Sequence, residues 1–380
     1  MIALDGVAAG ARVVVAMSGG VDSSVTAALL AAAGYDVIGI TLQLYDHGEA
    51  TEKANSCCAG RDISDARRVA AQLGIPHYVL DYESRFREAV IDDFADSYLA
   101  GYTPIPCVRC NQTVKFQDLL ACARDLGAAA LATGHYVRRI AGSDGPELHR
   151  AGELARDQSY FLFATTAEQL AYLRFPLADV PKAEVRAEAA RLALPVAEKP
   201  DSQDICFVPE GDYADLVEKL RPGALDPGPI ELADGTKIGH HTGIIGFTVG
   251  QRKGLRVAWP EPLYVLRIEP ARQAVVVGPK AALEQTALTL FETNWLAAPG
   301  ADQTLTVKLR STHPGASGTA CTLSGGRCDI TLDVPAGAIA PGQAAVLYDG
   351  SKMLGGGWIE RPVLTAHAPN RIALHPGAAE

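Results

Sequence analysis

The fold is decided near the N-terminus, by the stretch Val13-Val14-Val15-Ala16-Met17-Ser18-Gly19-Gly20-Val21-Asp22-Ser23-Ser24. Its first residues form a short apolar run, which is typical of a buried parallel strand. Two glycines then let the backbone approach a ligand closely, and a segment rich in Ala and Leu begins a helix. Free N–H groups and the positive end of a helix at such a turn favour phosphate. A tight turn capped by Asp22 or Ser23 is the plainer alternative. The full string after an apolar strand is more specific, so we predict nucleotide binding here.

Strand and helix patterns alternate over the first part of the chain, to about residue 200. Continuous apolar runs predict strands, and periodic segments predict helices between them. Alternation at this pace predicts an α/β fold with a doubly wound parallel sheet. The expected strands are 13–16, 36–44, 77–80 and 129–133, and the expected helices are 23–33, 63–73, 84–99, 113–126 and 183–192.

The character of the chain changes after about residue 208, where a Pro/Gly-rich stretch marks a boundary. Asp234-Gly235 and Asp349-Gly350 each lie between apolar runs and predict hairpins. Short strands are expected at 305–309, 320–323, 330–334, 344–348 and 358–359. We therefore predict a nucleotide-binding and catalytic domain (1–207), a small β-rich connector domain (208–282), a C-terminal β-barrel (283–365) and a tail (366–380).

Composition and charge indicate where in the cell this protein is located and which kinds of partner it can bind. The 380 residues are 48% hydrophobic and 21% charged, with a formal net charge of −10. No uncharged apolar run approaches the ~20 residues that span a bilayer, and the N-terminus lacks a signal-peptide layout. These features predict a cytoplasmic protein without a membrane partner. The negative charge disfavours a non-specific nucleic-acid coat, but it allows a local basic surface for one structured RNA.

The eight cysteines suggest metal or redox chemistry, because a reducing cytosol disfavours structural disulfides. Two groups stand out: Cys107-Val108-Arg109-Cys110, and Cys206 before Phe207. Helix N-termini and the neighbouring Arg109 are expected to lower the pKa of these thiols. Three further cysteines lie in apolar patterns and are interpreted as small buried hydrophobes, namely Cys122, Cys321 and Cys328.

The nucleotide loop lacks the lysine of a Walker A motif and resembles the PP-loop of ATP pyrophosphatases, whose fold is adenine nucleotide alpha hydrolase-like. Other strings resemble the tRNA-specific 2-thiouridylase (MnmA) family, in family order from residue 17 to residue 357. They are Met17 to Val25, Cys110-Asn111 before Lys115-Phe116, Ala132-Thr133-Gly134-His135-Tyr136, Asp157-Gln158-Ser159-Tyr160-Phe161, Asp204-Ile205-Cys206-Phe207, Thr248 to Leu255 and Leu354-Gly355-Gly356-Gly357.

The resemblance implies an ATP-dependent tRNA thiolase. ATP, with Mg²⁺ as its expected counter-ion, adenylates the carbon-2 oxygen of the wobble uridine and releases pyrophosphate. Sulfur from a persulfide then replaces the activated oxygen, giving 2-thiouridine and AMP. The family pattern makes Cys206 the persulfide carrier and Cys110 the nucleophile that attacks it. The partners implied are tRNA and a sulfur-donor protein that carries a persulfide, and a reductant must reset the cysteine pair.

Family positions carry over residue by residue. The ATP-binding residues are Ala16, Met17, Ser18, Gly19, Gly20, Val21, Asp22, Ser23, Leu42 and Gly134, and Asp22 also counts as catalytic. The tRNA-binding residues are Ile105, Pro106, Cys107, Arg156, Asp157, Gln158, Arg310 and Ser311. Leu42 replaces a Met of many relatives, and Ser311 stands where relatives often have an aromatic residue, which puts base stacking there in doubt. A further basic turn, Gln251-Arg252-Lys253-Gly254, is either a phosphate contact or a plain β-turn.

Cys107 is the main departure from the family, since many members have an Asp at this position as a proposed acid/base. Three interpretations stay open: a thiolate base, a second redox thiol, or one of three ligands (Cys107, Cys110, Cys206) of a [4Fe-4S] cluster. Zinc lacks a fourth ligand pattern. Cys57-Cys58 either approaches the same site or is an incidental pair. The competing functions are another PP-loop ligase, such as an amidotransferase synthetase or a lysidine-type tRNA ligase, and a non-catalytic RNA-binding protein.

Overall fold

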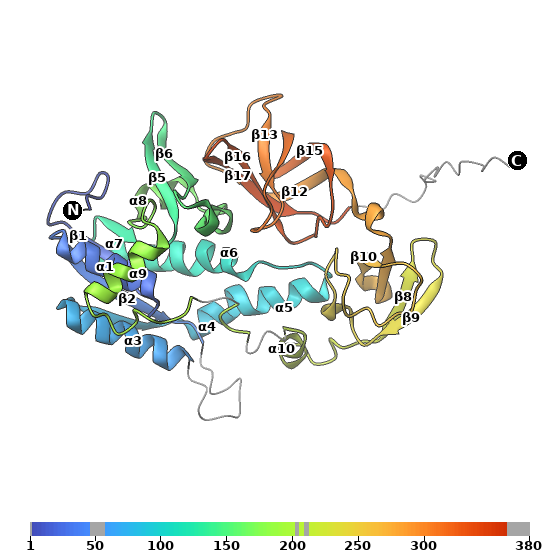
Figure 1. Cartoon of the computed structure of the whole chain (residues 1–380), viewed down its shortest axis with the longest axis horizontal. Coiled ribbons are helices and arrows are strands. Elements are labelled where there is room, and N and C mark those ends of the chain that lie inside the picture. Colours follow the sequence, from blue (N-terminus) through green and yellow to red (C-terminus); the bar gives the residue numbers. More distant parts are fainter. Residues whose placement is uncertain (1, 46–57, 202–204, 209–212, 363–380) are drawn as a thin grey trace, which may run out of the picture.

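The computed structural model describes residues 2–45, 58–201, 205–208 and 213–362. It contains three β-sheets: a parallel sheet near the N-terminus, a small connector sheet and a C-terminal barrel. Figure 1 shows the barrel in orange and red above the helices α5 and α6, and the yellow strands of the connector to the right of these helices. The predicted domain limits stay a prediction, and the predicted tail 366–380 lies outside the described residues.

The parallel sheet has the strand order β3-β2-β1-β4-β7. Its strands are β1 (Arg12–Ala16), β2 (Asp36–Gln43), β3 (His77–Asp81), β4 (Ala130–Ala132) and β7 (Leu173–Arg174), and every pairing is parallel. Val13 and Val15 pack into one apolar cluster and Val14 into another, so the two faces of β1 are both buried. The chain order reverses between β1 and β4, where doubly wound sheets bind ligands. The predicted fold class is confirmed.

Helices cover both faces of this sheet. On one side, α1 (Val21–Ala32) packs against α3 (Cys58–Leu73) and α9 (Lys182–Arg191). The other side is covered by α7 (Leu119–Asp125), whose Leu119 and Leu120 join the cluster of Val14 and Leu131. The predicted helices 23–33, 84–99 and 183–192 match the observed bounds within two residues, whereas 63–73 and 113–126 begin five and seven residues after the observed helices.

Two predicted helices have π-helical middles instead of one continuous α-helix. The first consists of α4 (Glu83–Phe86), η1 (Arg87–Ile91) and α5 (Asp92–Leu99), and the second of α6 (Pro106–Cys110), η2 (Asn111–Asp118) and α7. The Leu119 N–H donates to the Val114 carbonyl, five residues back, which is the π pattern. Residues five apart in η2 therefore lie one above the other, and this sets the thiol site described below.

The connector sheet has the order β10-β11-β8-β9 and follows α10 (Tyr213–Leu220). Its strands are β8 (Gly228–Leu232), β9 (Lys237–His241), β10 (Tyr264–Glu269) and β11 (Ala274–Gly278), with short helices η6 (Ile244–Gly246), η7 (Pro270–Arg272) and η8 (Lys280–Leu283). The hairpin expected at Asp234-Gly235 joins β8 and β9 and is confirmed; Gly235 has a φ of +88° there.

The barrel consists of β12 (Gln285–Trp295), β13 (Leu305–Lys308), β14 (Ala316–Leu323), β15 (Arg327–Ala336), β16 (Ala344–Asp349) and β17 (Lys352–Ile359). It closes because β12 pairs with both β15 and β17. The predicted barrel and the Asp349-Gly350 hairpin are confirmed, whereas β12 was not predicted.

An additional hairpin links the first domain to the barrel. It consists of β5 (Val137–Gly142) and β6 (Gly145–Arg150), and β6 pairs with β17 through Leu148 and Met353. The short helices η3 (Leu154–Arg156), η4 (Ser159–Leu162) and α8 (Ala167–Tyr172) follow it. Within the described ranges, no helix has the length and apolar character needed to cross a membrane.

Candidate active site

The nucleotide loop lies at the carboxyl end of β1, at the point where the strand order reverses. Gly19 has a φ of +75°, and a Cβ there would overlap the backbone of Asp62 in α3. The Ser18 N–H donates to Ser23 Oγ at 3.1 Å, and Ser24 Oγ donates to the Gly20 carbonyl at 2.8 Å. These bonds hold the loop against the start of α1, whose first N–H groups have no partners within the helix. The geometry suits an anion.

Asp22 is held by Lys182, which the sequence did not single out, and by Tyr136, which ends one of the family strings. Lys182 Nζ lies 2.6 and 2.8 Å from its two carboxylate oxygens, and the Tyr136 hydroxyl donates to it at 2.7 Å. Lys182 is only 6% exposed and also pairs with Asp201 at 2.9 Å. Burial alone would raise the pKa of Asp201, but the bond and charge of Lys182 hold it below its usual value. A buried cation therefore lies beside the loop.

A second lysine touches the loop from the segment before Asp201. Lys199 Nζ donates to the Gly19 carbonyl at 2.9 Å and to Asp62 and Asp65 at 2.6 Å each. The loop thus has an ammonium group on each side, although it lacks the lysine of a Walker A motif. Both lysines lie far from the loop in sequence, so no local motif could have identified them.

The other predicted ATP contacts lie at the neighbouring strand ends. Ala16 ends β1, and Leu42 lies next to the end of β2 and packs against the clusters on either side. Gly134 follows β4, and a Cβ there would lie 2.9 Å from the backbone of Asp22 and Ser23. The structure therefore brings Gly134 directly against the nucleotide loop.

The thiol site is built around the continuous helix α6–η2. Cys110 ends α6 and is buried, whereas Cys107 and Cys206 are exposed. Because η2 is π-helical, Lys115 lies one turn below Cys110. Its ammonium group interacts electrostatically with all three thiols, Cys107, Cys110 and Cys206.

An aromatic cluster fixes the turn that carries Cys206. Phe207 packs edge-on against Phe86 at 5.7 Å and Phe94 at 5.3 Å between ring centroids. Phe207 and Cys110 belong to the same buried cluster. The residue after Cys206 is therefore anchored in the same apolar cluster as Cys110, although the two cysteines are far apart in sequence.

The pKa prediction for these thiols is wrong. Burial raises the pKa of Cys110. Cys107 and Cys206 reach the surface, but the protein atoms crowded around them still desolvate their thiolates, which raises the pKa of Cys107 and raises that of Cys206 to about 12. Lys115 opposes the rise in each case. Arg109 points away, since it donates to Glu292 at 2.9 Å and its guanidinium lies 4.6 Å from the Trp358 ring centroid. The barrel takes up the arginine charge, and Lys115 is the cation that serves the thiols.

His135 connects the thiol site to the nucleotide loop. It follows Gly134, and its Nδ1 lies 2.9 Å from Thr133 Oγ1. Burial, with a smaller effect of Lys115, lowers the pKa of His135 to about 3. The imidazole is therefore neutral at working pH, and its ring packs edge-on against Phe116, the residue after Lys115, at 5.9 Å between ring centroids.

A resident metal does not fit the residues that the structure describes: no group of three or more His, Cys, Asp or Glu side chains among them could hold a metal ion. The three predicted cluster ligands, Cys107, Cys110 and Cys206, are among the described residues and do not form such a group. We derive no step through an iron–sulfur cluster.

Sequence comparisons match the chain to known families along its length. The tRNA methyl transferase HUP domain matches residues 11–210, the tRNA methyl transferase PRC-barrel domain residues 215–279, and the aminomethyltransferase beta-barrel domain residues 285–359. The tRNA-specific 2-thiouridylase MnmA of Rhodospirillum centenum is 62% identical over 359 residues, which is 92% of each chain. That of Parvibaculum lavamentivorans is 59% identical, over 92% of this chain and 91% of the relative.

This chain belongs to the tRNA-specific 2-thiouridylase (MnmA) family. The resemblance found in the sequence is thereby confirmed. Among solved structures, a 4-thiouridine synthetase–RNA complex with bound ATP overlaps 55% of this chain and 50% of its own, at 15% identity and a TM-score of 0.36.

The positions predicted to contact tRNA differ in exposure. Arg156 is exposed and pairs with Asp201 at 3.0 Å, and Arg310 is exposed after β13 beside the half-buried Ser311. Asp157 and Gln158 are only partly exposed, and their side chains bond within the protein. Asp157 accepts from Ser159 at 2.8 Å, and Gln158 accepts from the Tyr136 N–H at 2.9 Å.

Two other predicted contacts are buried. Ile105 is 8% exposed, and Pro106, at the first turn of α6, is buried as well. Of this trio only Cys107 is exposed. Ile105 and Pro106 fix the start of the helix that carries the thiols.

The remaining cysteines divide differently from their prediction. Cys328 is fully buried, as expected, but Cys122 is only partly buried and Cys321 is exposed. Cys321 lies in the last part of β14, where three consecutive residues are exposed. Cys57 and the side chain of Cys58 lie outside the described residues, so their proposed approach to the site is not addressed.

Proposed function

We propose that this chain is an ATP-dependent tRNA thiolase that converts uridine to 2-thiouridine, as its family membership indicates. The observation that carries the proposal is the short path between two sites: Gly134 touches Asp22 in the loop, and His135 interacts with Lys115, the cation of the thiols. A uridine placed between them would meet the activating nucleotide and the sulfur. Other PP-loop ligases need no thiol group here.

ATP binding is assigned to the loop and its neighbouring strand ends. The N–H groups at the start of α1 would bind phosphate oxygens, and Lys182 and Lys199 would balance their charge. The proposed contacts are those predicted: Ala16, Met17, Ser18, Gly19, Gly20, Val21, Asp22, Ser23, Leu42 and Gly134. Mg²⁺ binds through few carboxylates plus substrate phosphates, so Asp22 with the ATP phosphates is a sufficient donor set.

In the activation step, the carbon-2 oxygen of the wobble uridine attacks the α-phosphorus of ATP. An oxygen–phosphorus bond forms, the bond to the β-phosphate bridge breaks, and pyrophosphate leaves. A carbonyl oxygen is a poor leaving group, whereas the AMP it now carries is a good one. Asp22 orients the loop through its bonds to Lys182 and Tyr136.

In the sulfur step, Cys206 carries the outer sulfur as a persulfide received from a donor protein. The Cys110 thiolate attacks the inner sulfur of Cys206, a Cys110–Cys206 disulfide forms, and hydrosulfide is released. Hydrosulfide adds to carbon 2 and AMP leaves with its oxygen, giving 2-thiouridine. A dithiol reductant then returns both cysteines to thiols.

Lys115 supports this step by stabilising the thiolate of Cys110, which burial would otherwise disfavour. Cys107 has the same cation within reach and is assigned as a base or a second redox thiol. The tRNA is expected to contact Arg156, Arg310 and Ser311 and to cover the start of α6. We propose a cytoplasmic location, where a bacterial tRNA substrate would be available.

The test compares Cys110→Ser, Cys206→Ser and a matched control, Cys122→Ser, on unmodified tRNA with a persulfide donor. Thiolation should fall to background in the first two and persist in the control. Pyrophosphate release that requires tRNA should persist in all three, because activation precedes sulfur transfer. Full thiolation by Cys206→Ser would disprove the sulfur route. Absence of tRNA-stimulated pyrophosphate release from the wild type would favour a non-catalytic RNA-binding protein.

A second measurement addresses the cluster. Protein purified without oxygen is analysed for iron and labile sulfide and assayed in parallel. Thiolation by iron-free protein with a persulfide donor eliminates a required cluster. Activity that appears only with stoichiometric iron would contradict the persulfide route.

A further inference from the structure

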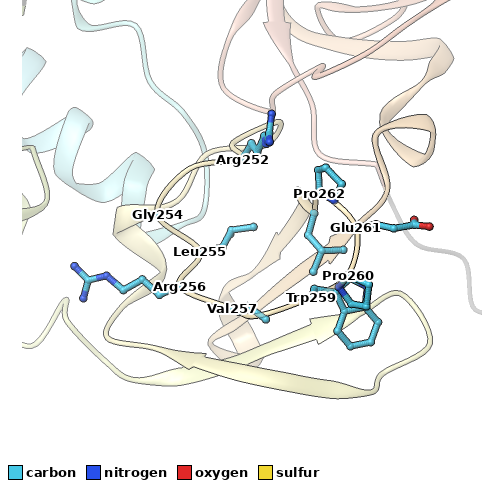
Figure 2. A pocket seen from close by; sticks show the side chains of 10 residues that line it. Arg252, Gly254, Leu255, Arg256, Val257, Trp259, Pro260, Glu261 and Pro262 are labelled. Atoms are coloured by element: carbon cyan, nitrogen blue, oxygen red, sulfur yellow. The ribbon is translucent and has the colours of Figure 1, made fainter.

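The connector domain carries a pocket that neither the nucleotide loop nor the thiol site uses. It has a volume of about 360 Å³ and lies within the irregular segment between η6 and β10. Figure 2 shows the segment curving round the opening, with Leu255, Val257 and Pro262 toward its interior and Arg252, Arg256, Trp259 and Glu261 around it. Ligand pockets commonly span about 300–1,000 Å³, so one nucleotide-sized group fits.

The segment is held in this shape at both ends. At its neck the Gly250 N–H donates to the Val265 carbonyl at 2.8 Å, and the Val265 N–H donates to the Gln251 carbonyl at 2.9 Å. Leu255 and Leu263 are each 7% exposed and pack into the connector core. The pocket is therefore preformed, although its residues form neither helix nor strand.

The segment that forms the rim of the pocket, from Arg252 to Leu263, carries a net positive charge, and its cations form no ion pairs within the described residues. The segment from Arg252 to Leu263 holds three cations, Arg252, Lys253 and Arg256, against one anion, Glu261, in a chain with net charge −10. Over the described ranges none of these three cations has an ion-pair partner, whereas Arg267 and Arg272 of the same domain pair with Glu269. Cations left free on an acidic protein complement an anionic partner.

Trp259 adds an aromatic surface to this rim. It is 44% exposed, and the other two tryptophans, Trp295 and Trp358, belong to the barrel. Arg256, three residues before it, has a φ of +52° and Gly254 one of +85°. These turns set the two residues at opposite sides of the opening in Figure 2. An exposed indole and unpaired arginines around one opening form the combination that binds unpaired nucleotides, through base stacking and phosphate contacts.

The pocket is joined to the thiol helix through the barrel. A Cβ on Gly250 would meet the Cβ of Ala338, and Val249 packs with Ala340. The next residue, Pro341, accepts a bond from the Thr103 N–H at 2.8 Å, just before α6 begins. The connector segment that carries the pocket is therefore packed against the same part of the barrel that bonds the chain just before α6.

We propose that this pocket, with Arg252, Arg256 and Trp259, is a docking site for an unpaired nucleotide of the tRNA outside the reacting uridine. This inference rests on the proposed function, because the tRNA substrate is its occupant. The site adds affinity and register for tRNA, and takes no part in bond making.

The test measures the Kd of unmodified tRNA, together with kcat and KM for tRNA, in Trp259→Ala, Trp259→Phe and the double variant Arg252→Ala/Arg256→Ala. Trp259→Ala should weaken binding about 5- to 100-fold, the usual range for one stacked base. The double variant should reduce the slope of log Kd against log salt by about one for each phosphate that the protein no longer neutralises. In both, kcat at saturating tRNA should be unchanged.

Trp259→Phe keeps a stacking ring and should retain most of the affinity. If binding quenches tryptophan emission in the wild type, the quenching should shrink in this variant, which guards against a folding defect in Trp259→Ala. Arg12→Ala and Tyr78→Ala are the matched controls, an exposed arginine and an exposed aromatic on the parallel sheet, and should bind as the wild type does.

Unchanged Kd, KM and salt slope in all pocket variants would overturn the inference and leave the proposed thiolation intact. A raised KM for the persulfide donor with unchanged tRNA affinity would assign the pocket to the donor protein and also overturn it. Absence of thiolation by the wild type would instead count against the proposed function, since tRNA affinity is measured separately.

Discussion

His135→Asn tests whether a neutral imidazole is buried between the two halves of the active site. The ring packs edge-on against Phe116 at 5.9 Å and Phe175 at 6.5 Å, and burial with the nearby Lys115 lowers the pKa of His135 to about 3. In the unfolded chain the same group titrates near 6.5. Below that pH the unfolded state binds a proton that the folded state does not, so stability must fall as the pH falls.

The magnitude follows from linkage. Between pH 7.5 and pH 5.0, protonation of His135 in the unfolded state alone costs the folded enzyme about 2 kcal/mol, at about 1.4 kcal/mol per pH unit below 6.5. Because pH 5.0 lies above the folded pKa, the figure depends on the unfolded pKa only. The Asn variant has no such proton, so its stability relative to the wild type should rise by about 2 kcal/mol over this interval.

The assay is urea unfolding followed by circular dichroism at pH 7.5, 6.5 and 5.0. Helix signal reports mainly on the first domain, because α10 is the one α-helix of the described residues that follows α9. Other titrating groups cancel in the difference between the two proteins. His240→Asn, at an exposed position of β9, is the control and should run parallel to the wild type. A difference that stays constant with pH would refute the burial of a neutral His135.

Two further predictions concern the loop and the thiol cation. Gly19→Ala should lower tRNA-dependent pyrophosphate release at least 10-fold, because a left-handed φ costs about 1–2 kcal/mol and the new Cβ overlaps the backbone of Asp62. Gly34→Ala is the control: its φ is also left-handed, at +85°, but the space around it is open, so it separates backbone strain from overlap. Equal losses of pyrophosphate release in both variants would contradict the reasoning. Lys115→Met should shift the pH dependence of thiolation to higher pH, since Cys110 loses the cation that opposes the rise of its pKa; an unshifted profile would remove Lys115 from the sulfur step.

The parallel sheet and the loop were predictable because their signals are local. The apolar run from Val13 and the turn at Gly19-Gly20 lie within a few residues of one another, and burial on both faces requires that pattern. The hairpins at Asp234-Gly235 and Asp349-Gly350 depend equally on adjacent residues. Family resemblance added the cysteine pair, which no spacing rule connects.

The partners of these residues were not predictable, because they come from distant segments. Lys182 reaches Asp22 across 160 positions, and Lys199 reaches Gly19 across 180. The side chain of Arg109 is the clearest example of a contact that the sequence could not predict. Its position next to Cys110 in sequence suggested that it pairs with a thiolate, but its guanidinium bonds Glu292 and packs over Trp358, both in the barrel.

The contacts of Arg156-Asp157-Gln158 give this segment a structural role beside its predicted contact with tRNA. Gln158 bonds the backbone of Tyr136, whose hydroxyl holds Asp22, and Asp157 bonds Ser159, whose hydroxyl lies 2.9 Å from that of Tyr348 in the barrel. Substitution of either residue would disturb the nucleotide loop or the barrel interface even if no RNA touched it. Arg156 is the exposed member of the segment, but it shares the ambiguity, because it bonds Asp201, the carboxylate that also holds Lys182. Loss of tRNA affinity in an Arg156 variant would therefore count as a direct contact only if ATP binding without tRNA stayed unchanged.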